Sequence, residues 1–561
     1  MRIKGVTMKR CRRQLAVALL ALVAAVAVVL AGCGSSGGGG GAGNTPKKGG
    51  TLRVSFQTES AGLDPAIAYD LESCTIEWTM FDTLLKWSSG PGEAGSKLIP
   101  DLATEVPSVQ NGGISADGKT YTFHMRAGVK FAPPVNRELT AADWKYSFER
   151  MIAAPQAWGS YFFEGIVGDL AYYNHKAEDI SGIKVLDPQT IEIDLIKPDP
   201  TLLYKIALPA TFVVDKAWVE KWGKNVNHHP LGTGPFMFSK WVPGQEIDFV
   251  RNPNYWDASK VWLDGIDFKF GATPTAAVLK LERGDIDVLG DGLPPGEQVR
   301  VAKDPNWKNN IASAPQVAWY YVFMNVREKP FDNIKVRQAV NYAINTAKLQ
   351  KLLAGQGKAL NQIFPEGMPG YQANAQFYTY DPTKAKQLLA EAGFPNGFKT
   401  TFWTHNVDPF PKISQSIQYD LSQVGIKADI KQLEQGTYWT AIANQNEHVP
   451  IGMNDWWMDY PDPSDWIGPN FTKTSALTNG SYNASWWWDP QCEALWQQSN
   501  TEMDPAKRIQ LFVEMQQIIM EQAPVVPLYQ PMLTTMFSKT TGGVYVHPVW
   551  QFMFADYWKS Q

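Results

Sequence analysis

The amino-acid sequence predicts an α/β protein with two or more lobes. Short stretches that alternate apolar and polar residues, as half-buried strands do, fill the first half of the chain. Helical patterns lie between these stretches and dominate later, and strands interleaved with helices are typical of α/β folds. The chain has 561 residues. After an amino-terminal leader, about 510 residues remain, which is more than one hydrophobic core usually organises.

The predicted strands begin near Gly49, where the run Gly49–Val54 is expected to open the folded part. Further strands are expected at Thr120–Met125, Thr190–Ile196, Glu246–Arg251 and Gly265–Phe270. No unit of about 20–50 residues repeats along the chain, so a solenoid or propeller is not expected.

Helices are predicted from apolar spacing and from terminal signals. Two of them open with an aspartate N-cap followed by proline, at Asp381 and at Asp504. Gly393 is placed to cap the end of the first, and Pro524 lies beyond the end of the second. Apolar residues recur at helical spacing at Val336, Ala339, Val340, Ala343 and Ile344, and at Leu511, Met515, Ile518 and Ile519.

The amino terminus is typical of an export signal. Six basic residues precede an uncharged, mostly apolar run from Gln14 to Ala31. The run ends in Leu30-Ala31-Gly32-Cys33, which resembles a bacterial lipoprotein signal with cleavage before the cysteine. A permanent transmembrane anchor is the alternative, because about 18 apolar residues can just span a bilayer. Met8 is a second plausible start beside Met1.

Residues 1–32 are therefore expected to be a signal peptide, and residues 33–48 a flexible glycine-rich tether. Two acyl chains on Cys33 would anchor the protein stably, whereas one would not. The sequence thus predicts an exported protein held at the outer face of the bacterial cytoplasmic membrane, or a periplasmic one.

The charge balance argues against a nucleic-acid partner. Without the leader, 45 basic residues stand against 55 acidic ones, and nucleic-acid binding requires a basic face. Two cysteines remain in the body, Cys74 and Cys492. Export permits a disulfide between them, and two buried free thiols are the alternative, so the sequence leaves their pairing open.

No catalytic motif stands in a suitable context. The matches to G-x-S-x-G and G-x-G-x-x-G lie in the glycine-rich tether, with no strand before and no helix after. His228 and His229 are adjacent, but no nearby cysteine or carboxylate completes a tetrahedral metal set. We therefore expect no catalytic residues, no metal and no cofactor.

The segment from Asp455 to Pro463, with the sequence DWWMDYPDP, combines carboxylates with indoles. Aspartate is rarely buried without a partner, so a carboxylate walled by indoles could pair with a ligand ammonium group. The alternative is that Asp459 or Asp462 caps a helix that begins near Ser464. Spacing alone does not separate these interpretations.

The chain resembles the family 5 extracellular solute-binding proteins of ABC importers, which include oligopeptide- and dipeptide-binding proteins. The resemblance covers nearly all of the chain after the tether and rests on the order of its motifs. These motifs are Gly49–Val54 with Leu63-Asp64-Pro65, Pro100–Ala103, Asp117–Phe131 with Leu139–Asp143, Gly232–Phe236, Arg251–Trp256, Val336–Ile344 and Gly425–Ala428.

The resemblance implies a two-lobed, periplasmic-binding-protein-like α/β fold of the type II, large peptide-binding class, with an inserted subdomain in the first lobe. Lobe I is expected at 49–315 and 530–561, and lobe II at 316–529. The implied function is non-enzymatic: a monomer captures peptides between the lobes and delivers them to permease and ATPase subunits.

In peptide-binding members, an aspartate of the matching segment pairs with the α-ammonium group of the peptide, and Asp459 stands at that position. Trp457, Tyr460 and Asn483 are implied to lie along the cleft. The residue that binds the ligand carboxylate is undetermined, and Arg327 and Arg337 are candidates by charge alone.

The chain departs from the family pattern in two places. Phe131–Asn136 replaces the usual continuation of its motif, and the indoles of Trp456–Trp457 and Trp486–Trp488 exceed what a peptide site requires. Because sugar faces stack on tryptophan, an oligosaccharide is an alternative ligand, and a metal complex is another.

A secreted hydrolase is a more distant alternative, since it would need two carboxylates about 5–9.5 Å apart across a cleft. A further alternative is a sensory protein that presents its ligand to a membrane receptor.

Overall fold

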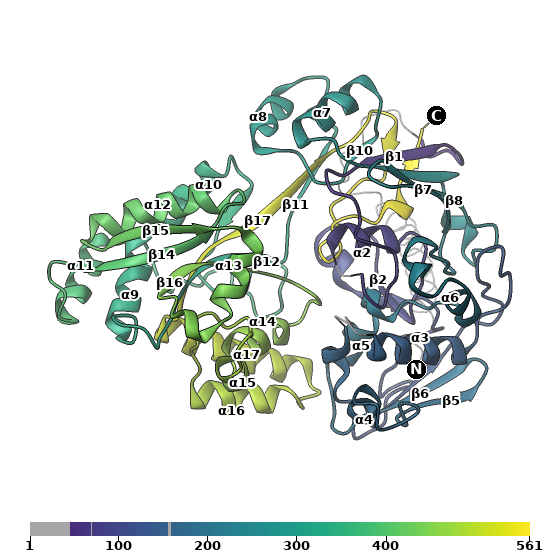
Figure 1. Cartoon of the computed structure of the whole chain (residues 1–561), viewed down its shortest axis with the longest axis horizontal. Helices are drawn as coiled ribbons and strands as arrows, with labels where there is room; N and C mark the ends of the chain where they lie inside the picture. The colour runs from purple at the N-terminus through teal and green to yellow at the C-terminus, as the bar shows by residue number, and fades with distance from the viewer. Residues whose placement is uncertain (1–44, 69, 155–158, 561) are drawn as a thin grey trace, which may run out of the picture. The chain divides into compact units, whose positions relative to one another are not determined.

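The computed structural model describes residues 45–68, 70–154 and 159–560 (Figure 1). The predicted signal peptide, Cys33 and the tether as far as residue 44 lie outside the described residues. Within the described ranges, no helix is both long and apolar enough to cross a bilayer.

A five-stranded sheet forms first, with the strand order β10-β1-β9-β8-β7. Strand β1 lies parallel to β9 and β10, while β8 runs antiparallel to β7 and β9. The strands are β1 (Thr51–Ser55), β7 (Phe236–Val242), β8 (Glu246–Arg251), β9 (Gly265–Lys269) and β10 (Val288–Leu289).

A seven-stranded sheet forms from the second half of the chain. Its order is β11-β17-β12-β16-β14-β15, and β13 pairs with β17. Strand β14 runs parallel to β15 and β16, and the other pairs are antiparallel. The strands are β11 (Ile311–Pro315), β12 (Ala318–Met324), β13 (Gly357–Ala359), β14 (Lys399–His405), β15 (Lys427–Leu433), β16 (Ile451–Trp457) and β17 (Val525–Met536).

Strand β17 leads from the larger sheet towards the smaller one. After leaving β11 and β12, the chain makes an isolated bridge between Phe537 and Val288 of β10. The Thr535 hydroxyl donates to the carbonyl of Leu289 at 2.7 Å, and the Leu293 amide donates to the carbonyl of Thr534 at 2.6 Å. The carboxyl-terminal part of the chain is thereby fixed to both sheets.

The remaining named strands form three small sheets with the orders β4-β6-β5, β2-β3 and β18-β19. These strands are β2 (Leu85–Trp87), β3 (Leu98–Pro100), β4 (Thr120–His124), β5 (Ile183–Asp187), β6 (Thr190–Asp194), β18 (Thr541–Gly542) and β19 (Trp558–Lys559).

The α-helices of the described chain are α2 (Leu71–Glu77), α3 (Ala141–Ala153), α4 (Asp169–Tyr173), α5 (Leu202–Ile206), α6 (Lys216–Trp222), α7 (Pro274–Arg283), α8 (Pro295–Lys303), α9 (Ile334–Ala343), α10 (Thr346–Leu352), α11 (Pro382–Glu391), α12 (Phe410–Gln423), α13 (Gln435–Ile442), α14 (Ser464–Phe471), α15 (Lys473–Leu477), α16 (Pro490–Ser499) and α17 (Pro505–Gln522). The 3₁₀ helices are η1 (Gly92–Ser96), η2 (Ser160–Phe163), η3 (Pro209–Thr211), η4 (Gly223–His228), η5 (Ala258–Lys260), η6 (Gln445–Glu447) and η7 (Phe554–Asp556).

Helices α9, α11 and α12 lie beside the seven-stranded sheet, whereas α14 to α17 gather beyond its end (Figure 1). One buried cluster joins β12, β14 and β16 to α9 and α12, with Val322, Val340, Phe402, Ile417 and Met453 among its members. A separate, larger cluster contains the core around the five-stranded sheet and also reaches residues of α14 and α17.

The helix and strand signals of the sequence are confirmed. Strand β8 has the predicted bounds, and β4, β6 and β9 begin where predicted. The Asp381 carboxylate accepts the Lys384 amide, and the Asp504 carboxylate accepts the amides of the first turn of α17. Gly393 takes a φ of +91° just after α11, a conformation that strains any residue with a Cβ.

Ordered contacts begin slightly before Gly49. The Lys47 amide donates to the carbonyl of Lys559 at 3.1 Å. The Lys48 ammonium donates to the carbonyls of Ser259 and Val261, and it lies 4.7 Å from the centre of the Trp262 ring. The last residues of the expected tether are therefore fixed to the body.

Candidate functional site

A cavity of about 310 Å³ lies where four segments of the chain meet. Helix α2 supplies one wall, the β11–β12 connection and the end of β16 supply others, and a carboxyl-terminal loop closes it. Its volume lies at the lower end of the range of small-ligand pockets. The lining residues are Leu71, Cys74, Gln316, Val317, Trp457, Met458, Asp459, Pro548, Val549, Trp550 and Gln551.

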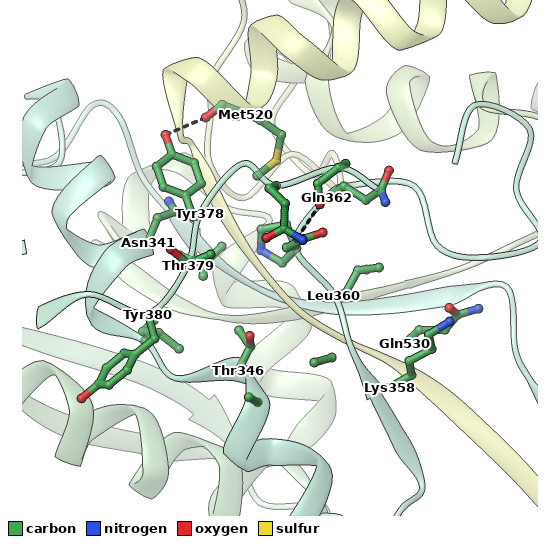
Figure 2. A pocket seen from close by; sticks show the side chains of 18 of the residues that line it. Asn341, Thr346, Lys358, Leu360, Gln362, Tyr378, Thr379, Tyr380, Met520 and Gln530 are labelled. Atoms are coloured by element: carbon green, nitrogen blue, oxygen red, sulfur yellow. Dashed lines mark hydrogen bonds between the residues drawn. The ribbon is translucent and has the colours of Figure 1, made fainter. Parts of the chain in front are cut away.

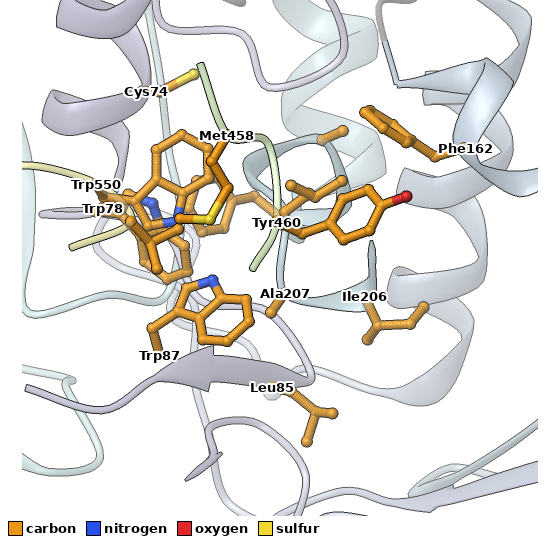
Figure 3. Packing of buried hydrophobic residues seen from close by; sticks show 14 of the residues in the cluster. Cys74, Trp78, Leu85, Trp87, Phe162, Ile206, Ala207, Met458, Tyr460 and Trp550 are labelled. Carbon is orange, nitrogen blue, oxygen red and sulfur yellow. The ribbon is translucent and has the colours of Figure 1, made fainter. Parts of the chain in front are cut away.

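The segment that carries Asp459 is anchored on both sides. The Met458 amide donates to the carbonyl of Val317 at 3.1 Å, which holds the chain beside β12 after β16 has ended. Met458 and Tyr460 are both buried members of the larger cluster, and Figure 3 shows Met458 among the indoles of Trp78, Trp87 and Trp550. Asp459 thus lies on the cavity between two side chains held by apolar packing.

Two further carboxylates of this turn, those of Asp462 and Asp465, form hydrogen bonds within the protein. Asp462 accepts the Ser464 amide at 2.9 Å and forms a buried, two-point ion pair with Arg508 of α17. Asp465 accepts the Asp459 amide at 3.0 Å. Asp462 thus bonds the first amide of α14, but the N-cap position is held by Pro463, so neither aspartate caps the helix, and Asp459 lines the cavity.

The packing of this turn also changes the pKa of the Asp465 carboxyl group. Its burial, together with the nearby charge of Asp459, raises the pKa of Asp465 well above its ordinary value.

Two polar groups of the cavity residues have no hydrogen-bond partner in the described chain. They are the side-chain amide nitrogen of Gln316 and the indole nitrogen of Trp550, both buried. A buried donor without an acceptor costs about 1–3 kcal/mol.

Trp457 presents its indole at the edge of the cavity, with 42% of its surface exposed. The indole N–H donates to the Asp455 carboxylate at 2.9 Å, which fixes the ring orientation. An exposed, oriented indole offers a flat apolar face to a ligand.

Tyr460 and Asn483, the other residues predicted for the cleft, are buried and are not among the lining residues. The Tyr460 hydroxyl lies 3.2 Å from the Ser464 hydroxyl, and its ring meets that of Phe162 edge-on at 5.9 Å, as Figure 3 shows. The Asn483 amide donates to the carbonyl of Trp487 at 2.9 Å and accepts from Ser485. The contact of both residues with ligand stays a prediction.

The two body cysteines are free thiols, and both are buried. Cys74 lines the cavity, and burial followed by the charges of Glu77, Asp70 and Asp459 raises the pKa of its thiol well above the ordinary value. Burial likewise raises the pKa of Cys492 to about 12. Both thiols are therefore neutral and slow to react near pH 7.

The two arginines considered for a ligand carboxylate are engaged elsewhere. Arg337 is buried and donates to the carbonyls of Gln522 and Phe331, and burial lowers the pKa of its guanidinium to about 10. Arg327 donates to the carbonyl of Ala476 at 2.7 Å and lies over the Trp486 ring at 5.0 Å. Neither residue lines the cavity.

A larger cavity of about 520 Å³ lies beside β13 and the loop that follows it, with Figure 2 looking into it. Its amide and hydroxyl groups mostly hold that loop in place. The Tyr378 hydroxyl donates to the carbonyl of Met520 at 2.9 Å, and the Asn361 amide donates to the carbonyl of Ala375 at 2.7 Å. The predicted site residues are not among its lining residues.

Within the described residues, no group of three or more His, Cys, Asp and Glu side chains is arranged to hold a metal ion. His229 stacks on Trp222 with 3.4 Å between ring centres, and His228 meets Trp241 edge-on. These two histidines take part in aromatic packing.

Sequence reasoning missed nine of the eleven lining residues, and three of these are Cys74, Gln316 and Trp550. These three are distant from Asp459 in the sequence, and none stands in a recognisable binding motif. Gln316 lies in the connection between β11 and β12, two strands that the sequence analysis did not predict.

Comparisons with known proteins agree with this architecture. Residues 97–477 match the family model described as bacterial extracellular solute-binding proteins, family 5 Middle. The chain is 30% identical over 502 residues to di/tripeptide-binding protein 1 of Pseudomonas aeruginosa (strain UCBPP-PA14), covering 85% of this chain and 89% of that protein. It is 30% identical over 448 residues to a glutathione-binding protein of Escherichia coli O1:K1 / APEC, covering 79% and 84%.

Among solved structures, the periplasmic binding protein DppA of Helicobacter pylori in complex with the peptide STSA superposes with a TM-score of 0.75. It is 27% identical, and the match covers 92% of this chain and 99% of that chain. The predicted fold class, a two-lobed α/β periplasmic-binding-protein-like fold, is confirmed by these matches.

Proposed function

The chain belongs to family 5 of the bacterial extracellular solute-binding proteins, and from this premise we propose that it captures peptides by their α-ammonium group beside Asp459. The relatives are binding proteins, and the chain is accordingly a binding protein rather than an enzyme. The peptide is bound and released without chemical change.

The proposal rests on the polar groups of the residues that line the cavity of about 310 Å³. It combines one carboxylate, Asp459, with two donors that lack acceptors, the Gln316 amide and the Trp550 indole. The amino end of a peptide offers the matching groups, an ammonium donor followed by carbonyl acceptors. Apolar neighbours, including Val317 and Trp457, leave room for a side chain of the peptide.

Ligand capture is coupled to closure of two lobes, which we place at 49–315 with 530–561 and at 316–529. The pairing of β17 with β11, β12 and β13, followed by the Phe537–Val288 bridge, supports a boundary within β17. A ligand that contacts both lobes adds interactions only in the closed form and so shifts the equilibrium towards it.

The closed monomer then delivers peptide to the permease of an ABC importer, whose ATPase is a separate subunit. A lipid on Cys33 tethers the chain to the outer face of the membrane, after cleavage of the signal peptide. The lipoprotein-like run Leu30–Cys33 supports this part of the proposal.

An oligosaccharide is the second candidate ligand, favoured by the two indoles of Trp457 and Trp550 on the cavity. Indole faces stack on sugars as well as on apolar side chains. Asp459 favours the peptide, because a neutral sugar gains no ion pair from a carboxylate.

The test compares trialanine with N-acetyl-trialanine by isothermal titration calorimetry. Acetylation removes the ammonium charge, so affinity is expected to fall roughly 10- to 100-fold, as for other hydrogen bonds to charged groups. Asp459→Asn is expected to weaken trialanine binding by a similar factor and to leave little further loss on acetylation.

Asp285→Asn is the matched control, since it makes the same chemical change at an exposed carboxylate away from the cavity. Its affinity for trialanine is expected to equal that of the unaltered protein. Equal binding of the free and acetylated peptides would contradict the role of Asp459. Binding of maltotriose, with no binding of any peptide, would replace the peptide by a sugar.

A further inference from the structure

A second carboxylate, Asp455, lies next to the cavity in an unusual setting. Its side chain and that of Trp457 project from the same face of β16, because they are two residues apart. Tyr320 of β12 pairs directly with Asp455, and Tyr529 of β17 pairs with Tyr320. Three neighbouring strands therefore place a carboxylate in line with two phenol rings.

Aromatic rings surround this carboxylate. Tyr320 and Tyr529 are stacked with 4.6 Å between their centres, and Tyr320 meets the Trp457 ring at 6.4 Å and 80°. Asp455 and Tyr320 are partly exposed, and Trp457 is exposed, so the group opens towards solvent at the end of the strand. The Tyr529 hydroxyl is buried and has no hydrogen-bond partner within the described chain.

The Asp455 carboxylate has no cationic partner in the residues that the structure describes. The one side chain that bonds to it there is the Trp457 indole, and none of the ion pairs of that part of the chain includes Asp455. Desolvation raises the pKa of Asp455 to about 6. An ionised carboxylate held among rings without a cation destabilises the free protein, and a bound cation would relieve that penalty.

Carboxylate and rings together form a surface suited to an organic cation. A guanidinium or ammonium group gains an ion pair from the carboxylate and a cation–π contact from the ring faces. The Trp457 ring belongs both to this group and to the cavity that contains Asp459. The two carboxylates are four residues apart, so their Cα atoms are at most about 13 Å apart, a distance that a short peptide spans.

We propose that Asp455, Tyr320 and Trp457 form a specificity subsite for a cationic side chain, lysine or arginine, of a peptide whose α-ammonium group is held by Asp459. The inference rests on the proposed function, since the same ligand bridges both carboxylates. It adds that the protein selects basic peptides over neutral ones of equal size.

A purely structural role for Asp455 makes a different prediction. If the carboxylate only orients the Trp457 indole, then an asparagine, whose side-chain oxygen also accepts a hydrogen bond, retains that role. Asp455→Asn removes the charge and keeps the acceptor, so it separates recognition of a cation from positioning of the ring.

The experiment measures the affinities of alanine tripeptides that carry one lysine at the first, second or third position. Each is paired with the same peptide carrying norleucine, which has a stem of similar length without the charge. At one position, the lysine peptide is expected to bind at least about 10-fold more tightly, a factor within the range of a partly desolvated ion pair with a cation–π contact. In Asp455→Asn, this preference is expected to disappear, so that the ratio of the two affinities falls to about 1.

Asp285→Asn again serves as the control, and it should retain the full preference for lysine. Equal affinities of the lysine and norleucine peptides at all three positions would overturn the subsite while leaving the proposed function intact. Survival of the preference in Asp455→Asn would also overturn it. Failure of every tripeptide, trialanine included, would overturn the proposed function and the subsite with it.

Discussion

Four aspartates between positions 455 and 465 have four different surroundings, although they share one short segment. Asp455 lies among rings, Asp459 lines the cavity, Asp462 is paired with Arg508, and Asp465 is buried beside Asp459. The surroundings set what each carboxylate can do, since burial favours the neutral form and a cation favours the ionised form.

The raised pKa of Asp455 has a consequence for stability. Burial raises this pKa from an ordinary value of 3.8 to about 6. As the pH rises, the unfolded chain therefore loses the proton before the folded one does, so ionisation of Asp455 favours unfolding. The penalty is absent below about pH 4 and complete above about pH 6, on the order of 1–3 kcal/mol.

We therefore expect Asp455→Asn to stabilise the protein without ligand at pH 8 by about 1–3 kcal/mol and to have little effect at pH 4. Urea unfolding at both pH values measures the difference in free energy. If Asp455→Asn both gains stability and loses the preference for lysine peptides, then Asp455 contributes to binding and lowers the stability of the free protein. A loss of stability at pH 8 would show that the charge of Asp455 strengthens its bond to the Trp457 indole by more than the desolvation costs.

At the scale of elements, the turn between β16 and α14 is held by long-range contacts. The Asp462–Arg508 pair joins this turn to α17, and the Met458 and Tyr460 side chains pack into the larger apolar cluster. These contacts determine where Asp459 lies, because the turn itself contains two prolines and no regular hydrogen-bond ladder.

Removing one partner of the buried ion pair should therefore be costly. Asp462→Ala leaves Arg508 buried without its carboxylate and is expected to lower the free energy of unfolding by about 3–5 kcal/mol. Asp504→Ala, which removes an exposed N-cap from α17, is the comparison and should cost only about 1 kcal/mol. Equal losses in urea unfolding would mean that the pair contributes no more than a surface cap.

At the scale of the whole molecule, Cys74 reports on the cavity. Its thiol is buried on the cavity wall, so a reagent reaches it only when the cavity opens. Cys492 is also buried but lies in α16, and it is not among the lining residues. The two thiols therefore form a probe and an internal control in one chain.

We expect a bound peptide to slow alkylation of Cys74 by N-ethylmaleimide. At a peptide concentration 100 times the dissociation constant, the rate should fall roughly 100-fold, because only the unoccupied form reacts. Alkylation of Cys492 should not change. Mass-spectrometric mapping of both cysteines over time gives the two rates, and parallel protection of both thiols would point to global stabilisation in place of occupancy of this cavity.

Local features were predictable from the sequence wherever neighbouring residues decide the outcome. The aspartate–proline openings of α11 and α17, the glycine after α11 and the alternation of β8 follow from backbone preferences and periodicity over a few residues. The order of family motifs along the chain likewise predicted the fold class, because family members share one architecture.

Only the tertiary structure decided which side chains meet. Leu71, Gln316, Asp459 and Trp550 come together at one cavity from four distant segments, and the Tyr529–Tyr320–Asp455 alignment depends on the register of three strands. It also placed Pro463 at the N-cap of α14, where the sequence offered Asp459 or Asp462 as the alternative to a ligand role. The physical reason is that such contacts arise from packing between elements, and no pattern within a single segment encodes its partner.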